Sequence, residues 1–345
     1  MGRGIGVRPM ESMTPRERFH AVMSFKPFDR LPVVEWAPWW DKTIERWRVE
    51  GLPAHLEGYD INRHFGLEVY RQWWFRSAGP ACPEPERRGA GIAETPADYE
   101  RIREHLYPWP VVDRDWWLEA ASKQAAGDEV IWMTLDGFFW FPREILGIEG
   151  HLYAFYDNPE LIHRINSDLA DHQLRLIDEV CKLAVPDFMT FAEDMSYNHG
   201  PMLSRAMFDE FMMPYYGRVV PALKARGILA FIDSDGDITA AARWFDEAGL
   251  DGILPLERQS GVDVATLRRD YPEMRFIGAF DKMTMSKGEA AMRREFERLL
   301  PVAAGGGLIV GCDHQTPPEV SYEDYRLYLA LAREYAEKAG RLSRR

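Results

Sequence analysis

The sequence predicts an α/β protein in which one domain forms a (β/α)8 (TIM) barrel with an irregular N-terminal region. Short apolar runs alternate with longer amphipathic segments through the second half of the chain. These runs lack regular polar alternation, which is typical of parallel strands covered on both faces. A chain of 345 residues with 46% hydrophobic content is long enough for one barrel-sized core.

The second half supplies the clearest βα units. A strand is expected at 187–194 and a helix at 204–226, because an apolar run rich in Phe and Met precedes a segment with helical spacing of apolar residues. Four further units are expected, each a strand followed by a helix: 228–233 with 238–249, 251–257 with 262–272, 274–281 with 287–300, and 306–313 with 321–340.

The first half is less regular. Strands are expected at 31–36 and 129–136 and a long helix at 159–184, while residues 51–128 include Pro/Gly-rich and Pro-broken stretches. A strand at 66–74 would complete an eight-stranded barrel. A doubly wound open sheet is the alternative, but no GxGxxG or GxxxxGK[ST] motif follows a strand, so nucleotide binding has no support.

Composition narrows the classes of function. The formal net charge of −13 disfavours nucleic-acid and anionic-membrane partners, which require concentrated Lys and Arg. Three cysteines without a CxxC pair argue against a disulfide framework. Without a secretory apolar run or a membrane-length apolar segment, we expect a soluble cytoplasmic protein. The expected organisation is a tail at 1–12, the barrel domain at 13–340 and a basic tail at 341–345.

Acidic residues end nearly every predicted strand. The carboxyl ends of the strands form the working face of a parallel barrel, so these residues are candidates for function. With almost no basic partner expected nearby, such a ring should hold a cation, share protons or bind a cationic substrate. The polar residues at these ends are Glu35, Asp136, Glu193, Asp194, Asp233, Asp235, Glu257, Asp281, Asp313, and, beside the last of these, Cys312 and His314.

The run FIDSDGD at 231–237 combines two expected roles. Asp233 and Asp235 lie two positions apart, so both side chains point to the same side if the strand continues through them. Asp237 is predicted to be the N-cap of the following helix. Tyr197 and Asn198 lie in an expected rim loop, where binding residues and ordinary turn residues are both common.

Tryptophans are concentrated early in the chain. Of the twelve, only Trp244 follows Trp140. An aromatic-lined cavity and ordinary core packing both account for this pattern.

Several segments resemble the uroporphyrinogen decarboxylase superfamily. They are TPRERFHAVMSFKPFDRLPVVEW at 14–36, DMSYNHGPMLSRAMFDEFMMPYYGRVVPALKARG at 194–227, IDSDGDI at 232–238 and GGGLIVGCDHQTPPEVSYEDYRLY at 305–328. The resemblance extends from about residue 13 to 338 and implies a βα barrel. It also implies one of two activities, porphyrinogen decarboxylation or methyl transfer with corrinoid proteins or coenzyme M.

The resemblance favours the methyltransferase branch. The decarboxylases carry an arginine-bearing segment where this chain reads EWAPWWDKTIERW at 35–47. The methyltransferases place the zinc ligands His and Cys where this chain has Asp233 and Asp235, and a third ligand, Cys, at the position of Cys312. The resemblance therefore implies a site for zinc or another divalent metal at Asp233, Asp235 and Cys312.

We therefore expect a methyltransferase that demethylates a small methoxyaryl or methylamine compound and uses a corrinoid protein as partner, with a homodimer as its expected assembly. Glu193, Asp235 and Glu257 are the predicted catalytic residues. Decarboxylation and non-catalytic binding of a corrinoid or porphyrin are the alternatives. The predicted substrate-binding residues are Trp36, Trp39, Trp73, Tyr197, Asn198 and His314.

Overall fold

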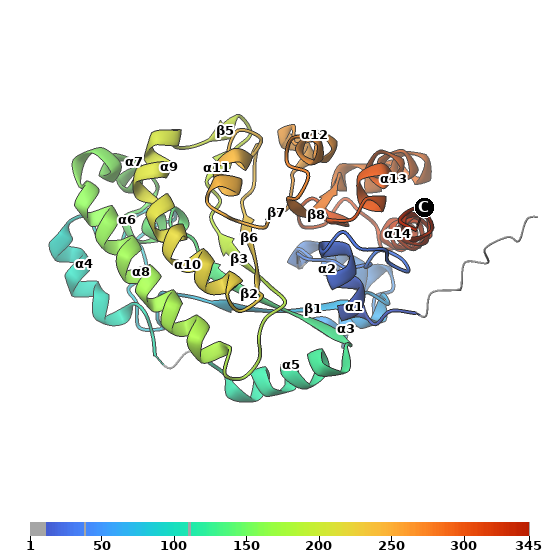
Figure 1. The fold of residues 1–345 in the computed structure, drawn as a ribbon, viewed down its shortest axis with the longest axis horizontal. Coiled ribbons are helices and arrows are strands. Elements are labelled where there is room, and N and C mark those ends of the chain that lie inside the picture. The colour runs from blue at the N-terminus through green and yellow to red at the C-terminus, as the bar shows by residue number, and fades with distance from the viewer. Residues whose placement is uncertain (1–11, 38, 110–111, 345) are drawn as a thin grey trace, which may run out of the picture.

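The computed structural model describes residues 12–37, 39–109 and 112–344. Its centre is a parallel sheet of seven strands in the order β1-β2-β3-β6-β7-β8-β9. The sheet curls, and helices cover its outer face (Figure 1). The seven strands are β1 (Val69–Phe75), β2 (Glu129–Asp136), β3 (Phe188–Ala192), β6 (Leu229–Asp233), β7 (Gly252–Leu254), β8 (Arg275–Phe280) and β9 (Leu308–Cys312).

Helices connect these strands in chain order. A two-residue antiparallel ladder, β4 (Ser196–Tyr197) with β5 (Gly200–Pro201), follows β3. The helices are α1 (Pro15–Met23), α2 (Asp41–Glu50), α3 (Tyr59–His64), α4 (Pro96–Ile102), α5 (Arg114–Ala126), α6 (Trp140–Leu146), α7 (Ile148–Asp157), α8 (Pro159–Val180), α9 (Arg205–Phe211), α10 (Met213–Lys224), α11 (Ala242–Glu247), α12 (Val264–Asp270), α13 (Glu289–Ala304) and α14 (Tyr322–Leu342). Short 3-10 turns are η1 (Arg103–His105), η2 (Arg258–Ser260) and η3 (Lys282–Lys287).

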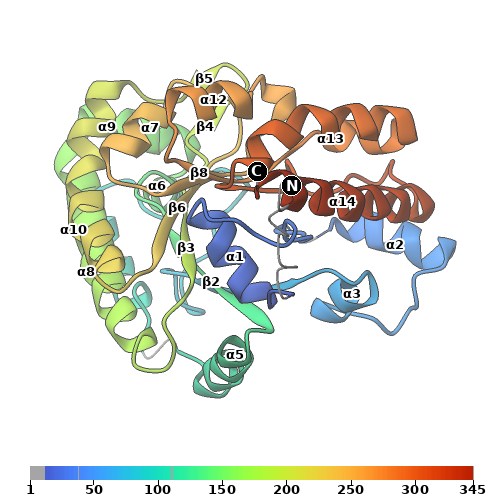
Figure 2. The same ribbon diagram turned by 45° about the vertical axis from the view of Figure 1, so that its right-hand side comes forward.

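The predicted βα units of the second half are confirmed, as are the strands at 66–74 and 129–136 and the long helix that becomes α8. Helix α8 forms because apolar residues recur at helical spacing, and Ile162, Ile165, Leu169 and Leu176 are all fully buried. Helices α8 and α10 lie side by side at one side of the sheet, and α13 and α14 at the other (Figures 1 and 2).

The strand expected at 31–36 is not formed. The Leu31 N–H donates to the carbonyl of Ala336 in α14, and Pro32 has no N–H to donate to a ladder. The segment still contacts both sheet edges, because the carbonyl of Val33 accepts from the N–H of Glu68 beside β1 and Trp36 bonds the carbonyl of Cys312 in β9. The described residues therefore form a seven-stranded sheet.

Helix α1 covers the amino ends of the strands. The ring of Phe19 lies 5.3 Å from that of Phe188 at the start of β3 and 5.5 Å from that of Tyr70 in β1. The N–H of Gly307, just before β9, donates to the carbonyl of Val22. Apolar packing thereby closes this end of the sheet, which leaves the carboxyl ends as the place for a functional site.

The prediction that Asp237 is a helix N-cap is wrong. Residues 239–241 form a turn, and α11 begins only at Ala242 with Ala241 as its N-cap. Asp237 instead accepts from the N–H of Thr239 and stabilises that turn.

No helix among the described residues combines the length and apolarity needed to cross a membrane.

Candidate functional site

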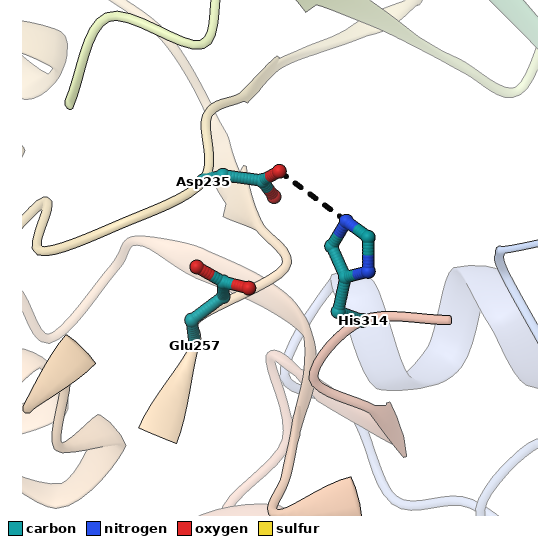
Figure 3. Close-up of side chains that lie close together, drawn as sticks. All are labelled: Asp235, Glu257 and His314. Carbon is teal, nitrogen blue, oxygen red and sulfur yellow. Dashed lines mark ion pairs between the residues drawn. The ribbon is translucent and has the colours of Figure 1, made fainter. Parts of the chain in front are cut away.

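Asp235, Glu257 and His314 come together at the carboxyl ends of the strands (Figure 3). They follow β6, β7 and β9, so parallel neighbours bring residues far apart in sequence to one place. Each side chain offers one ligand atom, and these atoms all lie within 4.8 Å of one another. We call these three residues the carboxylate–histidine group. Two carboxylates and an imidazole form a ligand set that suits several divalent metals.

His314 is oriented by two neighbours. Its Nε2 lies 3.3 Å from Oδ2 of Asp235. Burial disfavours the charged ring, but the hydrogen bond and charge of Asp235 outweigh it and raise the pKa of His314 overall. Trp36 presents an edge-on contact to the imidazole, with ring centroids 6.4 Å apart, and its Nε1 donates to the carbonyl of Cys312 at 2.6 Å. Trp36 therefore lies beside the carboxylate–histidine group.

A glycine turn positions Glu257. Oε2 of Glu257 accepts from the N–H of Gly236 at 2.8 Å. Gly236 has φ +81°, and a Cβ added there would lie 2.8 Å from the backbone of Tyr197. Only glycine fits such a position without strain. On its other side, Oε1 of Glu257 lies 3.6 Å from Nζ of Lys282.

A second acidic group adjoins the first. Ligand atoms of Asp194, Asp233 and Asp235 also lie within 4.8 Å of one another. Burial, followed by the charge of Asp235, raises the pKa of Asp194 to about 6, and burial with both neighbouring carboxylates raises the pKa of Asp233 well above its usual value. Carboxyl groups this close hold a proton or a cation near neutral pH.

Backbone strain accompanies these residues. Within the described parts of the chain, five non-glycine residues have positive φ, and three of them lie near strand ends: Asp194 at 39°, Leu256 at 67° and Ala279 at 70°. Such conformations cost about 1–3 kcal/mol each and cluster at functional sites. Asp194 belongs to the second acidic group, and Leu256 directly precedes Glu257 of the carboxylate–histidine group.

The carboxylate of Glu193, a predicted catalytic residue, is fully buried and bonded within the fold. It accepts from the N–H groups of Phe138 and Phe139 at 2.7 Å each, from that of Trp140 at 3.2 Å, and from the hydroxyl of Tyr216. Burial raises the pKa of Glu193 to about 7. Through these hydrogen bonds, Glu193 fixes the segment between β2 and α6.

Cys312 lies apart from the two acidic groups and belongs to neither of them within the described residues. Its side chain is fully buried, with Sγ 3.8 Å from Oγ1 of Thr316. Burial and the nearby carboxylates of Glu35 and Asp313 raise the pKa of the thiol well above its usual value. Among the described residues, the ligand atoms of Asp233, Asp235 and Cys312 do not all lie within 4.8 Å of one another, so these three residues do not fit a zinc site. The carboxylate–histidine group does fit a divalent cation.

The other predicted substrate-binding residues have different environments. Trp39 packs among the rings of Trp47, Phe65 and Tyr325, away from the carboxylate–histidine group. Tyr197 is 51% exposed on the rim. Oδ1 of Asn198 accepts from the hydroxyl of Ser260, a neighbour of Glu257.

Trp73 lies on the outer face of β1. Its ring packs 4.8 Å from that of Trp116 in α5. The adjacent residue, Trp74, instead donates from Nε1 to Oδ1 of Asp136 at 3.1 Å. Since side chains alternate along a strand, Trp74 points to the opposite face from Trp73, beside Asp136 at the end of β2.

Several acids of the predicted ring are held by backbone donors. Asp136 accepts from the N–H of Ser77, and Asp281 accepts from that of Met283. Asp313 is buried and accepts from the N–H groups of Arg258 and Lys282, which ties β7, β8 and β9 together. These carboxylates stabilise the loops that carry the candidate site.

Cations also lie among these acids, so the expectation of almost no basic partner is wrong. Nζ of Lys282 lies 3.6 Å from the carboxylates of both Glu257 and Asp313. Arg76 and Arg143 were not singled out from the sequence. Arg76, however, directly follows the end of β1, and the first residue of η3 is Lys282, so strand ends examined for bases as well as acids would have found two of the three.

Comparisons with known proteins point to one family. The family model described as Uroporphyrinogen decarboxylase (URO-D) matches residues 145–335. None of the curated proteins matches the chain.

Solved structures show remote similarity. A candidate vitamin-B12 independent methionine synthase from Listeria monocytogenes has 12% identity and TM-score 0.46, with 89% of this chain and 97% of that chain covered. A candidate alpha-galactosidase from Bacteroides fragilis has 11% identity and TM-score 0.42, with 91% and 61% covered. A beta-glycosidase from Thermosphaera aggregans has 9% identity and TM-score 0.44, with 83% and 86% covered. Similarities this low imply no shared activity.

The family match covers more than half of the chain, including every strand from β3 onward and the loops that carry the carboxylate–histidine group. The chain belongs to the uroporphyrinogen decarboxylase (URO-D) family.

Proposed function

We propose that this URO-D family member is a methyltransferase that removes a methyl group from a small methylated compound and passes it to the corrinoid of a partner protein. The observation that carries the proposal is the carboxylate–histidine group at the carboxyl ends of β6, β7 and β9. It includes Asp235, one of the positions at which the resemblance to methyltransferases implies a metal ligand. The metal set is then Asp235, Glu257 and His314 in place of Asp233, Asp235 and Cys312.

A divalent cation held by these three residues would supply Lewis acidity for the oxygen or nitrogen from which the methyl group departs. The surrounding side chains have separate tasks. Asp194, whose pKa is raised to about 6, can hold a proton near neutral pH and donate it to the departing atom. Lys282, whose side chain is 14% exposed, pairs with both Glu257 and Asp313 and holds them in place.

The proposal also includes a closed barrel. Segment 31–36 contacts β1 on one side and β9 on the other, and we assign it the place of the eighth strand. A barrel closed at its amino end by α1 leaves the carboxyl ends for the substrate and the corrinoid partner.

Methyl transfer to cob(I)alamin, followed by its absorbance change, tests the proposal with a panel of methoxyarenes and methylamines. We expect transfer from at least one class, with loss in Glu257→Gln. The matched control is Asp171→Asn, because Asp171 is an exposed carboxylate of α8 that pairs with Arg218 and belongs to neither acidic group.

Two results would contradict the proposal. No transfer from any compound by well-folded enzyme would refute methyl transfer, and equal transfer by wild type and Glu257→Gln would refute the role of the carboxylate–histidine group. Incubation with uroporphyrinogen, followed for loss of carboxyl groups, tests the alternative of decarboxylation.

A further inference from the structure

Arg143 is a half-buried cation beside the candidate site, and no carboxylate lies within 4.0 Å of its guanidinium among the described residues. The guanidinium carbon lies 4.1 Å from the centroid of the Trp140 ring. Nη1 donates to the backbone carbonyl of Asp194 at 3.2 Å. A buried guanidinium more often has a carboxylate partner, as Arg71 has in Glu129 at 2.6 Å.

Most of the donors of Arg143 are unused. A guanidinium has five N–H donors in a planar fork, and only the bond to Asp194 is made within the described residues. Nε and Nη2 of Arg143 make no hydrogen bond within the described residues and are not among the buried polar atoms without a partner, so both reach solvent-accessible space. Burial lowers the pKa of Arg143, although the charges of Asp194, Glu144 and Glu193 partly oppose it. The free side of the fork can therefore accept an anion.

Arg76 provides a second cation at the neighbouring strand end. Its guanidinium stacks 3.6 Å from the centroid of the Trp74 ring. Its Nη1 lies 3.8 Å from Asp136 and 3.9 Å from Glu144, beyond hydrogen-bond distance in both cases. Asp136 already accepts from Trp74 and from the N–H of Ser77. Arg76 therefore also retains donors for a ligand.

One residue, Asp194, joins Arg143 to the carboxylate–histidine group. The backbone carbonyl of Asp194 accepts from Arg143, and its carboxylate groups with those of Asp233 and Asp235. Only Asp194 therefore separates a small molecule that contacts Arg143 from the carboxylates of Asp233 and Asp235. Its two ends would meet opposite charge environments, cationic at Arg143 and anionic at Asp235.

We propose that Arg143, assisted by Arg76, binds the carboxylate of the substrate, which makes the substrate a small methylated carboxylic acid. This inference rests on the proposed function and adds the class of substrate. A planar guanidinium fixed on an indole ring is suited to bidentate binding of a carboxylate. The methylated atom then lies toward Asp235, Glu257 and His314, and it is an ether oxygen or an amine nitrogen, each of which has a lone pair.

Equilibrium binding tests the inference without any turnover. The probes are 4-methoxybenzoate against its amide, and N,N-dimethylglycine against its amide, since each amide lacks the carboxylate. We expect one of the two acids to bind more tightly than its amide. In Arg143→Gln its affinity should fall on the order of 10- to 100-fold, as for loss of a charged hydrogen-bond partner, and the preference for acid over amide should disappear.

The matched control is Arg175→Gln. Arg175 also stacks on an indole, 4.6 Å from the Trp109 ring, but on the outer surface of α8. Its replacement should leave binding unchanged. If Arg143→Gln is unfolded by circular dichroism, Arg143→Lys serves in its place, with a weaker acid preference expected because the bidentate geometry is lost.

Three results would overturn the inference: no acid bound by wild type, amides bound as tightly as acids, or unchanged affinity in folded Arg143→Gln. Its failure is separable from that of the proposed function. Arginine-dependent binding of an acid without methyl transfer refutes the function alone. Methyl transfer from neutral methoxyarenes that is indifferent to Arg143 refutes the carboxylate alone.

Discussion

Replacement of Glu193 by Ala should destabilise the fold strongly. The carboxylate is fully buried and receives three backbone N–H groups, at 2.7, 2.7 and 3.2 Å, besides the hydroxyl of Tyr216. Each buried donor left without an acceptor costs about 1–3 kcal/mol. Three donors at the lower part of that range give a loss of about 3–5 kcal/mol, a large share of the stability of a typical domain.

Urea unfolding monitored by circular dichroism measures this loss. Glu179→Ala is the control, because Glu179 is an exposed carboxylate whose ion pair with Lys182 should contribute only about 0–1 kcal/mol. Gly137 should be similarly intolerant, since a Cβ there would lie 2.2 Å from the carboxyl carbon of Glu193. If the free energy of unfolding of Glu193→Ala is less than about 1 kcal/mol below that of the wild type, a structural role for this carboxylate is refuted. Wild-type stability with abolished turnover in Glu193→Gln would instead support the catalytic role predicted from the sequence.

Two further predictions concern Glu35 and the turn at Gly236. Burial raises the pKa of Glu35 from 4.5 to about 8, although Tyr325 donates to it, so its neutral form stabilises the fold fully below pH 4.5 and this contribution is lost as the pH rises toward 8. Glu35→Gln should remove that part of the pH dependence in thermal unfolding, and identical pH profiles for the two proteins would exclude it. Gly236→Ala should lower stability by about 1–3 kcal/mol in urea, because its φ is +81° and its Cβ would meet the Tyr197 backbone, and it should weaken metal binding by displacing Glu257. Unchanged stability and metal affinity would show that the turn does not position the site.

The fold of the second half could be predicted because its strands are continuous apolar runs. Every run from 187 onward became a strand of the parallel sheet, with helices between them. The 31–36 segment was misassigned because its apolar pattern is that of a strand. Its pairing is decided by Pro32 and by the hydrogen bond from Leu31 to α14, and apolar pattern carries no information about such partners.

The candidate site could be predicted in part. Their positions at predicted strand ends made Asp235, Glu257 and His314 candidates. The sequence did not show that the three side chains lie together, because this depends on which strands are neighbours in space. The difference between Trp73 and Trp74 is one position of strand register, which only a known partner strand fixes. Arg143 lies beyond the start of α6 and away from any strand end, so its approach to Asp194 required the folded chain.

Metal content measured by elemental analysis tests the central claim most directly. Protein purified without chelator should retain a divalent metal, lose it in Asp235→Ala and His314→Ala, and keep it in Cys312→Ser, since Cys312 lies outside the carboxylate–histidine group. Loss of metal in Cys312→Ser with full retention in His314→Ala, or no bound metal in the wild-type protein, would contradict the account.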